Sequence, residues 1–85
     1  MDDLRLVLEV RDHAGDPVEG AFVTVTGAAR PVPEVARLTG PDGSLAIRLP
    51  AGPVSLVAVR EGLSAAGETV LEAEDQRLVL MLPPA

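Results

Sequence analysis

The sequence predicts an all-β fold, a seven-stranded Greek-key β-sandwich that forms a single domain over residues 1–85. Three observations support this prediction. Apolar and polar residues alternate with the period of two that half-buried strands show, and no segment has the 3.6-residue period of a helix. Clusters of Gly, Pro and Asp separate the apolar segments at short intervals. The chain has one Phe and no Trp or Tyr, so Leu and Val must form the core.

The first half of the chain contains three predicted strands. The first is Leu4–Arg11, in which Val7 lies on the face opposite the inward-facing residues Leu4, Leu6, Leu8 and Val10. Residues 12–17 are rich in turn formers and predict a loop, beneath which Val18 packs. The second strand is Ala21–Thr26, with Ala21, Val23 and Val25 inward and Phe22 outward. After a loop with two prolines at residues 27–33, a third strand is expected at Glu34–Thr39.

The second half contains four more predicted strands. A tight turn at residues 40–43 leads into a strand at Ser44–Leu49, and a turn at residues 50–53 leads into the next at Val54–Val59. Glu61-Gly62 then turns the chain, and Leu63 is expected to cover the core just after it. Residues 64–67 are small and predict a flexible segment. A sixth strand is expected at Glu68–Glu72, an acidic turn at residues 73–75, and a seventh strand at Gln76–Leu82.

The composition argues against several classes of partner. The formal net charge is −6 and all seven basic residues are Arg, so no nucleic-acid partner is expected, because phosphate binding needs a basic patch. No apolar segment approaches the roughly 20 residues of a membrane span, so no membrane insertion is expected. The acidic start, Met1-Asp2-Asp3, is unlike a signal peptide. The chain as it stands is therefore expected to be cytoplasmic, or extracellular if it is part of a longer exported protein.

Few residues could carry chemistry, so neither enzymatic activity nor a cofactor is expected, and no catalytic, metal or cofactor-binding residue is predicted. The one histidine, His13, lies in a loop between Asp12 and Asp16. An exposed loop histidine is a simpler interpretation of this residue than a catalytic base. Calcium would need six to eight converging oxygen atoms. The available acids are in turns, where they usually bind their own backbone or face solvent: Asp12, Asp16, Asp42, Glu72, Glu74 and Asp75.

Several predicted strands are apolar on both faces, although a sandwich needs only one apolar face per strand. The surplus side chains predict an interface with a protein partner or a homodimer. Scattered surface aliphatic residues are the alternative. Phe22 is expected either to fold over the sheet edge or to serve as an exposed anchor. The candidate interface residues are Val7, Phe22, Val57, Val59, Val79 and Met81.

Three segments, Val10–Gly27, Thr39–Leu63 and Leu78–Pro84, resemble the carboxypeptidase regulatory-like domain, a family with a transthyretin-like, or Ig-like, β-sandwich. The first family motif, D-x-x-G-x-P-V-x-G-A, is matched by residues 12–21. The second, T-x-x-D-G, is matched by Thr39, Asp42 and Gly43. The third, L-P-x-G, is matched at Pro50 and Gly52. The chain departs from the family where aromatic residues are usual, at Val54 and Leu63.

This resemblance implies an accessory module that stands beside a catalytic domain and performs no chemistry itself. The sequence therefore predicts a non-catalytic interaction or structural module that acts through an apolar outer sheet face. Two alternatives remain. One is a small-ligand carrier with a site at a subunit interface, for which no residue gives specific support. The other is the regulatory domain of a separate hydrolase.

Overall fold

The computed structural model describes residues 3–32 and 36–84, which form strands and loops without any helix. The described residues form seven strands: β1 (Asp3–Arg11), β2 (Phe22–Gly27), β3 (Arg37–Leu38), β4 (Ser44–Pro50), β5 (Gly52–Arg60), β6 (Leu63–Leu71) and β7 (Gln76–Met81). None of these described segments is a helix that is long and apolar enough to cross a membrane.

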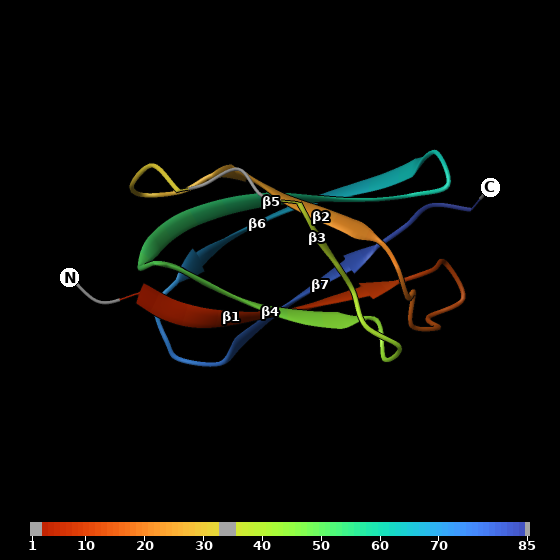
Figure 1. Ribbon diagram of the computed structural model, residues 1–85, viewed down its shortest axis with the longest axis horizontal. Helices are drawn as coiled ribbons and strands as arrows, with labels where there is room; N and C mark the ends of the chain where they lie inside the picture. The colour runs from red at the N-terminus through yellow and green to blue at the C-terminus, as the bar shows by residue number, and fades with distance from the viewer. Residues whose placement is uncertain (1–2, 33–35, 85) are drawn as a thin grey trace.

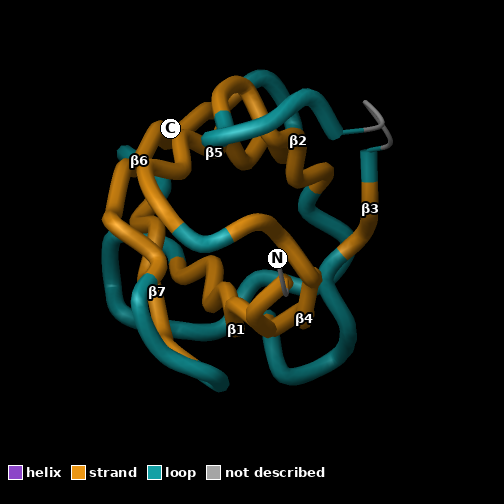
Figure 2. The backbone as a smooth tube through the Cα atoms, turned by 90° about the vertical axis from the view of Figure 1, so that its left-hand side faces the viewer, coloured by secondary structure: helices purple, strands orange, loops and turns teal. Residues whose placement is uncertain are grey.

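The strands form two sheets packed face to face (Figure 1). One sheet has the order β4-β1-β7, and the other has the order β3-β2-β5-β6. Viewed along the long axis, β6 lies over β7 at one side and β3 lies near β4 at the other (Figure 2). All strand pairs are antiparallel except β1 with β7, which is parallel. The chain crosses between the sheets repeatedly, which confirms the predicted β-sandwich.

The core between the sheets is aliphatic, as the composition predicted. Its fully buried members come from β1, β2, β4, β5 and β6 and from Ala21, just before β2. The larger ones are Leu6, Leu8, Val10, Val23, Leu49, Val54, Leu56 and Leu71. They follow the predicted alternation, because successive side chains of a strand point to opposite faces. Leu63 and Val18 pack against this core, also as predicted.

Two predicted strands differ from the structure. The sixth was expected at Glu68–Glu72 after a flexible segment, but β6 already begins at Leu63 and includes Gly67. A Cβ atom at Gly67 would overlap Leu80 of β7, so the absence of a side chain makes room for the other sheet. The third strand was expected at Glu34–Thr39. Only Arg37–Leu38 pairs with β2, and residues 33–35 lie outside the described part of the chain.

Two turns that are far apart in the sequence are joined at one end of the sandwich. The N–H of Val10 donates to the carbonyl oxygen of Gly43 at 2.8 Å, and the N–H of Val18 donates to the carbonyl oxygen of Val10 at 2.9 Å. Gly43 has a φ of +74°, and a Cβ there would lie 2.8 Å from both Val10 O and Val18 N. The close approach of three backbone segments therefore requires glycine at this position.

Thr39 adds a second connection between these segments. Its side-chain hydroxyl donates to the carbonyl oxygen of Val18 at 2.7 Å and accepts from the N–H of Ala21 at 3.0 Å. Its backbone N–H donates to the carbonyl oxygen of Ala21, and its carbonyl oxygen accepts from the N–H of Gly20, both at 3.0 Å. Thr39 is 4% exposed. Four hydrogen bonds thus hold the entry to β2 against the segment that follows β3.

Replacing Gly43 by alanine should therefore be severe. We expect Gly43→Ala to lower the free energy of unfolding by about 3 kcal/mol or more, because it combines a left-handed backbone with a clash against fixed backbone atoms. The matched control is Gly15→Ala, where φ is +89° but no atom lies within 4 Å of the added Cβ. This control should cost only about 1 kcal/mol. Equal losses in urea denaturation would show that the close approach at Gly43 is unimportant.

Candidate functional site

The six predicted interface residues lie on two opposite surfaces of the sandwich. Phe22, Val57 and Val59 lie on the outer face of the β3-β2-β5-β6 sheet. Val7, Val79 and Met81 lie on the outer face of the β4-β1-β7 sheet. One flat partner surface therefore cannot cover all six, and the two faces have to be considered separately.

The outer face of the four-stranded sheet carries a continuous apolar row. Leu38 of β3 pairs with Phe22 of β2, and Phe22 pairs with Val59 of β5. These three side chains are 56%, 54% and 40% exposed, in that order. Val57, half-buried, lies on the same face one position along the pleat from Val59. We refer to Phe22, Leu38, Val57 and Val59 as the β3-β2-β5 patch.

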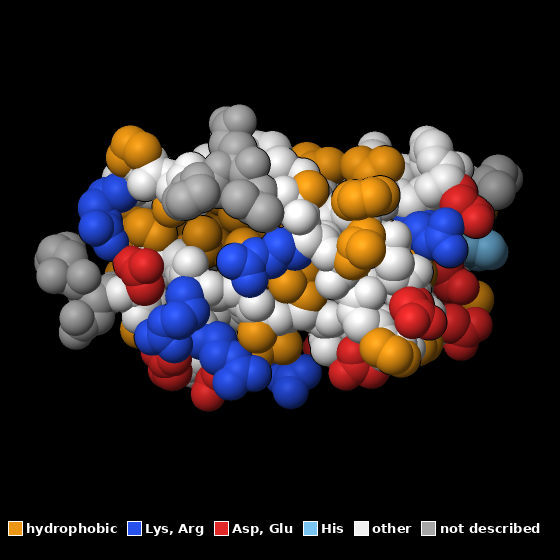
Figure 3. Space-filling view, in the orientation of Figure 1, with side chains coloured by type: hydrophobic (Ala, Val, Ile, Leu, Met, Phe, Trp, Pro, Cys, Tyr) orange, Lys and Arg blue, Asp and Glu red, His pale blue; other side chains and the backbone are white. Residues whose placement is uncertain are grey.

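The residues that pair with the β5 members of the β3-β2-β5 patch from outside it are uncharged. Thr24 pairs with Val57 on one side, and Ala66 of β6 pairs with it on the other. Ser64 lies beside Val59. Hydrophobic side chains gather in Figure 3 at the upper right, over the side where β2 and β3 run in Figure 1. Because Phe22 lies between β3 and β5, it is an exposed residue of the sheet face and does not fold over an edge.

The opposite outer face is mostly ionic. Three arginines on it each contact an acidic residue: Arg5 with Asp75 at 3.4 Å, Arg48 with Glu74 at 3.1 Å, and Arg77 with Glu9 at 3.1 Å. Val7 lies beside Arg77, Val79 beside Glu9, and Met81 beside Arg11 in the β1–β7 register. Val79 and Met81 are thus exposed but separated by charged groups. This face is less suited than the other to a dry apolar contact.

Two exposed apolar residues were missing from the sequence-based set. Leu38 was placed in a predicted strand without an assigned face, because a two-residue strand shows no alternation. Val70 lies on the outer face of β6 opposite Pro53. The signal for its exposure is the alternation of β6 that continues back to Leu63. The small residues in that stretch concealed the pattern.

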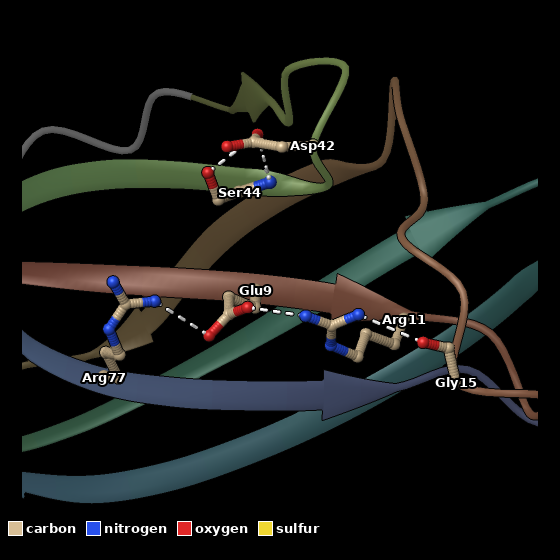
Figure 4. A network of polar contacts seen from close by, with 6 residues as sticks. All are labelled: Glu9, Arg11, Gly15, Asp42, Ser44 and Arg77. Atoms are coloured by element: carbon tan, nitrogen blue, oxygen red, sulfur yellow. Dashed lines mark hydrogen bonds and ion pairs between the residues drawn. The ribbon is translucent and has the colours of Figure 1, made fainter.

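Glu9 is the centre of a polar network on β1 (Figure 4). One carboxylate oxygen accepts from Arg11 Nη2 at 2.8 Å and the other from Arg77 Nη1 at 3.1 Å. Arg11 also donates through Nη1 to the carbonyl oxygen of Gly15 at 3.0 Å. The hydrogen bond from Arg11, followed by that from Arg77, lowers the pKa of Glu9 below its ordinary value of 4.5. The network ties β1 to β7 and to the first loop.

The turn aspartates bind their own backbone. Asp12 Oδ1 accepts from the N–H groups of Ala14 and Asp16, both at 2.9 Å. Asp42 Oδ1 accepts from the hydroxyl and the N–H of Ser44. These two bonds, the hydroxyl first, lower the pKa of Asp42 (Figure 4). Within residues 3–32 and 36–84, no group of three or more His, Cys, Asp or Glu side chains converges as a metal site would require.

The acidic turn before β7 has a structural use. Glu74 and Asp75 form ion pairs with arginines of the β4-β1-β7 sheet. The side-chain oxygen of Gln76 accepts from the N–H of Glu72 at 2.9 Å, and its Nε2 donates to the carbonyl oxygen of Val70 at 2.9 Å. These contacts join the end of β6 to the start of β7. The cluster does not turn its carboxylates toward a common point.

His13 is exposed and lies at a shallow pocket of about 380 Å³ that also includes Asp12, Arg60 and Leu63. The Arg60 side chain of this pocket already has two partners. Arg60 donates from Nε to the carbonyl oxygen of Glu19 at 3.1 Å and forms an ion pair with Glu61 at 2.9 Å. Asp12 Oδ1 accepts two backbone hydrogen bonds, and within residues 3–32 and 36–84 no hydrogen bond joins the Asp12 carboxylate to His13, as it would in a catalytic triad.

Comparison with known proteins identifies the fold but not a family. No protein-family model matches the chain, and no curated protein sequence matches it. Solved structures do match. The chain has an Ig-like β-sandwich fold. The carboxypeptidase regulatory-like assignment itself receives no support from a family model.

Three of the matching structures show how such a domain occurs elsewhere. A DUF3823 family protein from Parabacteroides merdae matches 98% of this chain with a TM-score of 0.70 and 15% identity, over 47% of its own length. A 3-chlorocatechol 1,2-dioxygenase from Rhodococcus opacus matches 99% with a TM-score of 0.75 and 11% identity, over 61% of its length. The C-terminal domain of the PapC usher matches 94% with a TM-score of 0.56 and 21% identity, over 99% of its length.

The present chain thus spans about half the length of the DUF3823 protein that it matches. At these identities the likeness describes the fold alone.

The Glu9 network predicts a pH-dependent contribution to stability. Because its pKa is lowered in the folded state, ionised Glu9 stabilises the fold above its unfolded pKa, and this contribution is lost as the pH falls through the folded pKa. The free energies of unfolding of the wild type and Glu9→Gln should therefore differ at neutral pH and converge well below pH 4.5. Chemical denaturation at a series of pH values measures this difference.

Glu68→Gln is the matched control, since Glu68 forms no ion pair among the described residues. Without an ion pair to lose, this variant should differ from the wild type by no more than about 0.5 kcal/mol at neutral pH. A Glu9→Gln difference that is constant from neutral to acid pH would contradict a stabilising role for the ionised network.

Proposed function

We propose that this chain is a non-catalytic β-sandwich module that binds a protein partner through the β3-β2-β5 patch. The observation that carries the proposal is the contrast between the two outer faces. One has a continuous row of exposed apolar side chains from Leu38 through Phe22 to Val59. The other is crossed by ion pairs. Apolar and aromatic side chains with few charges are typical of the centre of protein interfaces.

The use of the polar residues supports a role without chemistry. Asp12 and Asp42 organise turns, Glu9 binds two arginines, and Thr39 joins backbone segments. A catalytic group would need a free and oriented side chain beside a pocket. The polar side chains with defined partners are instead engaged in holding the fold.

The sequence resemblance also supports an accessory role without chemistry. The first two motifs of the carboxypeptidase regulatory-like domain lie in the two turns that Gly43 and Thr39 bring together. We propose that the chain acts beside a separate protein, as these regulatory-like domains stand beside a catalytic domain. A hydrolase is one such partner, and a gene neighbour that encodes one would favour this form of the proposal.

A small-ligand carrier is the second candidate, and the pocket at His13 is the observation that favours it. Its lining combines the charged side chains of Arg60 and Glu61 with the apolar side chains of Leu63 and Leu82. A set of small anionic and apolar compounds that raises the melting temperature would support this function. The effect should disappear in Leu63→Ser if the ligand occupies this pocket.

The face of the sandwich that binds the partner can be tested with matched charge substitutions. The immobilised chain is used to capture proteins from a lysate of its source cells, and the captured protein is then purified and titrated by calorimetry. Phe22→Glu and Val59→Glu should each weaken binding at least about tenfold, because a charge would be buried at the centre of the contact. Both side chains are exposed in the free domain, so the melting temperature should change little.

Val79→Glu is the control, since Val79 is 46% exposed on the opposite face. This variant should bind within about twofold of the wild type. Full binding by Phe22→Glu together with loss of binding by Val79→Glu would assign the interface to the ionic face and contradict the proposal.

A further inference from the structure

The outer edge of β6 has unpaired backbone groups along much of its length. β6 pairs with β5 on one side only and is the last strand of its sheet (Figure 2). The two strands are joined by Glu61-Gly62, with φ values of 51° and 80°, as in a type I′ turn. In such a hairpin the residues that flank the turn, Arg60 and Leu63, form a hydrogen-bonded pair.

The pattern of hydrogen bonds in β6 follows from this pair. Because hydrogen-bonded and non-hydrogen-bonded pairs alternate, Ala65, Gly67 and Thr69 bond to β5. Ser64, Ala66 and Glu68 therefore direct their N–H and C=O groups away from the sheet. Val70 belongs to the same set, and its carbonyl oxygen accepts from the side chain of Gln76, which confirms the direction.

The edge is covered at one end and open over the rest. Gln76 bonds to Val70 and to the N–H of Glu72 and so covers the end next to β7. For Ser64, Ala66 and Glu68, no side-chain or loop group of the described chain bonds to the backbone. The side chains here are small, and Glu68 is the one charge on β6.

The other three edge strands, β3, β4 and β7, differ from the open part of β6, and β7 contains a charged side chain, Arg77. β3 is two residues long. β4 contains Arg48, which reaches over to the carbonyl oxygen of Asp3, and ends at Pro50. Short length, charged side chains and proline are the usual means of preventing edge pairing. The open part of β6 has neither proline nor lysine nor arginine.

We infer that β6 pairs with β6 of a second copy of this chain, in an antiparallel arrangement about a two-fold axis at Ala66. In this register Ser64 faces Glu68 of the second copy, Ala66 faces Ala66, and Glu68 faces Ser64. Each pair exchanges two backbone hydrogen bonds. Glu68 can accept from the Ser64 hydroxyl opposite it. The two β3-β2-β5-β6 sheets become one continuous sheet, since the axis is perpendicular to its surface.

Charge and pairing favour this register over its neighbours. The two Glu68 side chains are separated by four residues along the strand direction, about 14 Å, which exceeds the Debye length at physiological salt. A shift that centres the axis on Glu68 would place the two carboxylates opposite each other. A shift that centres the axis on Ser64 would place the Glu61-Gly62 turn within the paired segment, and one hydrogen-bonded pair between the two strands would be lost. The register at Ala66 uses all three open residues.

The contact is small, so the dimer should be weak and dependent on concentration. It does not rest on the proposed function, because the edge and the β3-β2-β5 patch are different surfaces. The two patches of the dimer face the same side, so a dimer would present two copies of the patch to a partner.

Sedimentation velocity from about ten micromolar to about one millimolar tests the pairing. These concentrations bracket the dissociation constants expected of a weak contact. The wild type should shift from monomer to dimer. Ala66→Pro should raise the dissociation constant at least about tenfold, because both central hydrogen bonds are lost. The N–H of Ala66 makes no bond to the described residues of its own chain, so proline at this edge position should preserve folding.

Two controls separate the edge from the face. Ala66→Thr keeps the N–H and should dimerise like the wild type. Phe22→Glu alters the patch and should also dimerise. A wild type that stays monomeric at every concentration overturns the proposal. So does a dimer that persists in Ala66→Pro, or one that is lost in Phe22→Glu.

Hydrogen exchange provides a test that does not depend on a variant. The amide of Ala65 bonds to β5 and should be protected at all concentrations, whereas the amide of Ala66 should gain protection only where the dimer forms. Equal exchange of the Ala66 amide at low and high concentration would overturn the proposal, whether or not Ala66→Pro folds.

Discussion

The hydrogen bonds of Thr39 form the polar constraint on which this sandwich depends. Thr39 is buried, and its hydroxyl and backbone bind three backbone groups of the segment that leads into β2, while its carbonyl oxygen binds a fourth. Every one of these groups would otherwise be buried without a partner or displaced toward water. The core is aliphatic and non-directional. Apolar burial therefore stabilises the fold without fixing how the turns are placed, and Thr39 and Gly43 determine how the two turns meet.

This constraint gives a physical meaning to the motifs. The segment of residues 12–21 and the segment that begins at Thr39 contain the turn residues by which the sequence resembles the carboxypeptidase regulatory-like domain. In the structure these segments bind each other through the hydrogen bonds of Thr39, and Val18 and Gly43 each bond to Val10 of β1. Their residues are accounted for by folding. A function for the chain has to be sought on its surfaces, where the two sheets differ in chemistry.

Much of the fold could be predicted because the alternation of apolar and polar residues along a strand indicates which side chains are buried. β1, β2, β4 and β5 each place the expected residues in the core. The start of β6 could not be predicted, because Ala65 and Gly67 face the core without the large side chains that mark an inward position. β3 is too short to show a pattern. The order of strands within the sheets depends on long-range pairing, for which the sequence contains no local signal.

The candidate site was predicted in part. Alternation identified Phe22, Val57 and Val59 as outward-facing, and equally Val79 and Met81. It could not show that these two groups belong to different sheets, or that ion pairs surround the second group. Those facts depend on which strands become neighbours. The open edge of β6 could not be predicted from the sequence either. It depends on which residues of β6 bond to β5 and on the position of Gln76.

The most direct test of this account is the free energy of unfolding of Thr39→Val compared with that of Thr39→Ser. Valine keeps the shape of threonine but leaves the Val18 carbonyl oxygen and the Ala21 N–H without their partner. We expect the free energy of unfolding to fall by about 2–4 kcal/mol in Thr39→Val, and by about 1 kcal/mol in Thr39→Ser, which keeps the hydroxyl and loses one methyl group. If apolar burial alone determined stability at this position, the order would be reversed. A Thr39→Val variant at least as stable as Thr39→Ser would contradict the account.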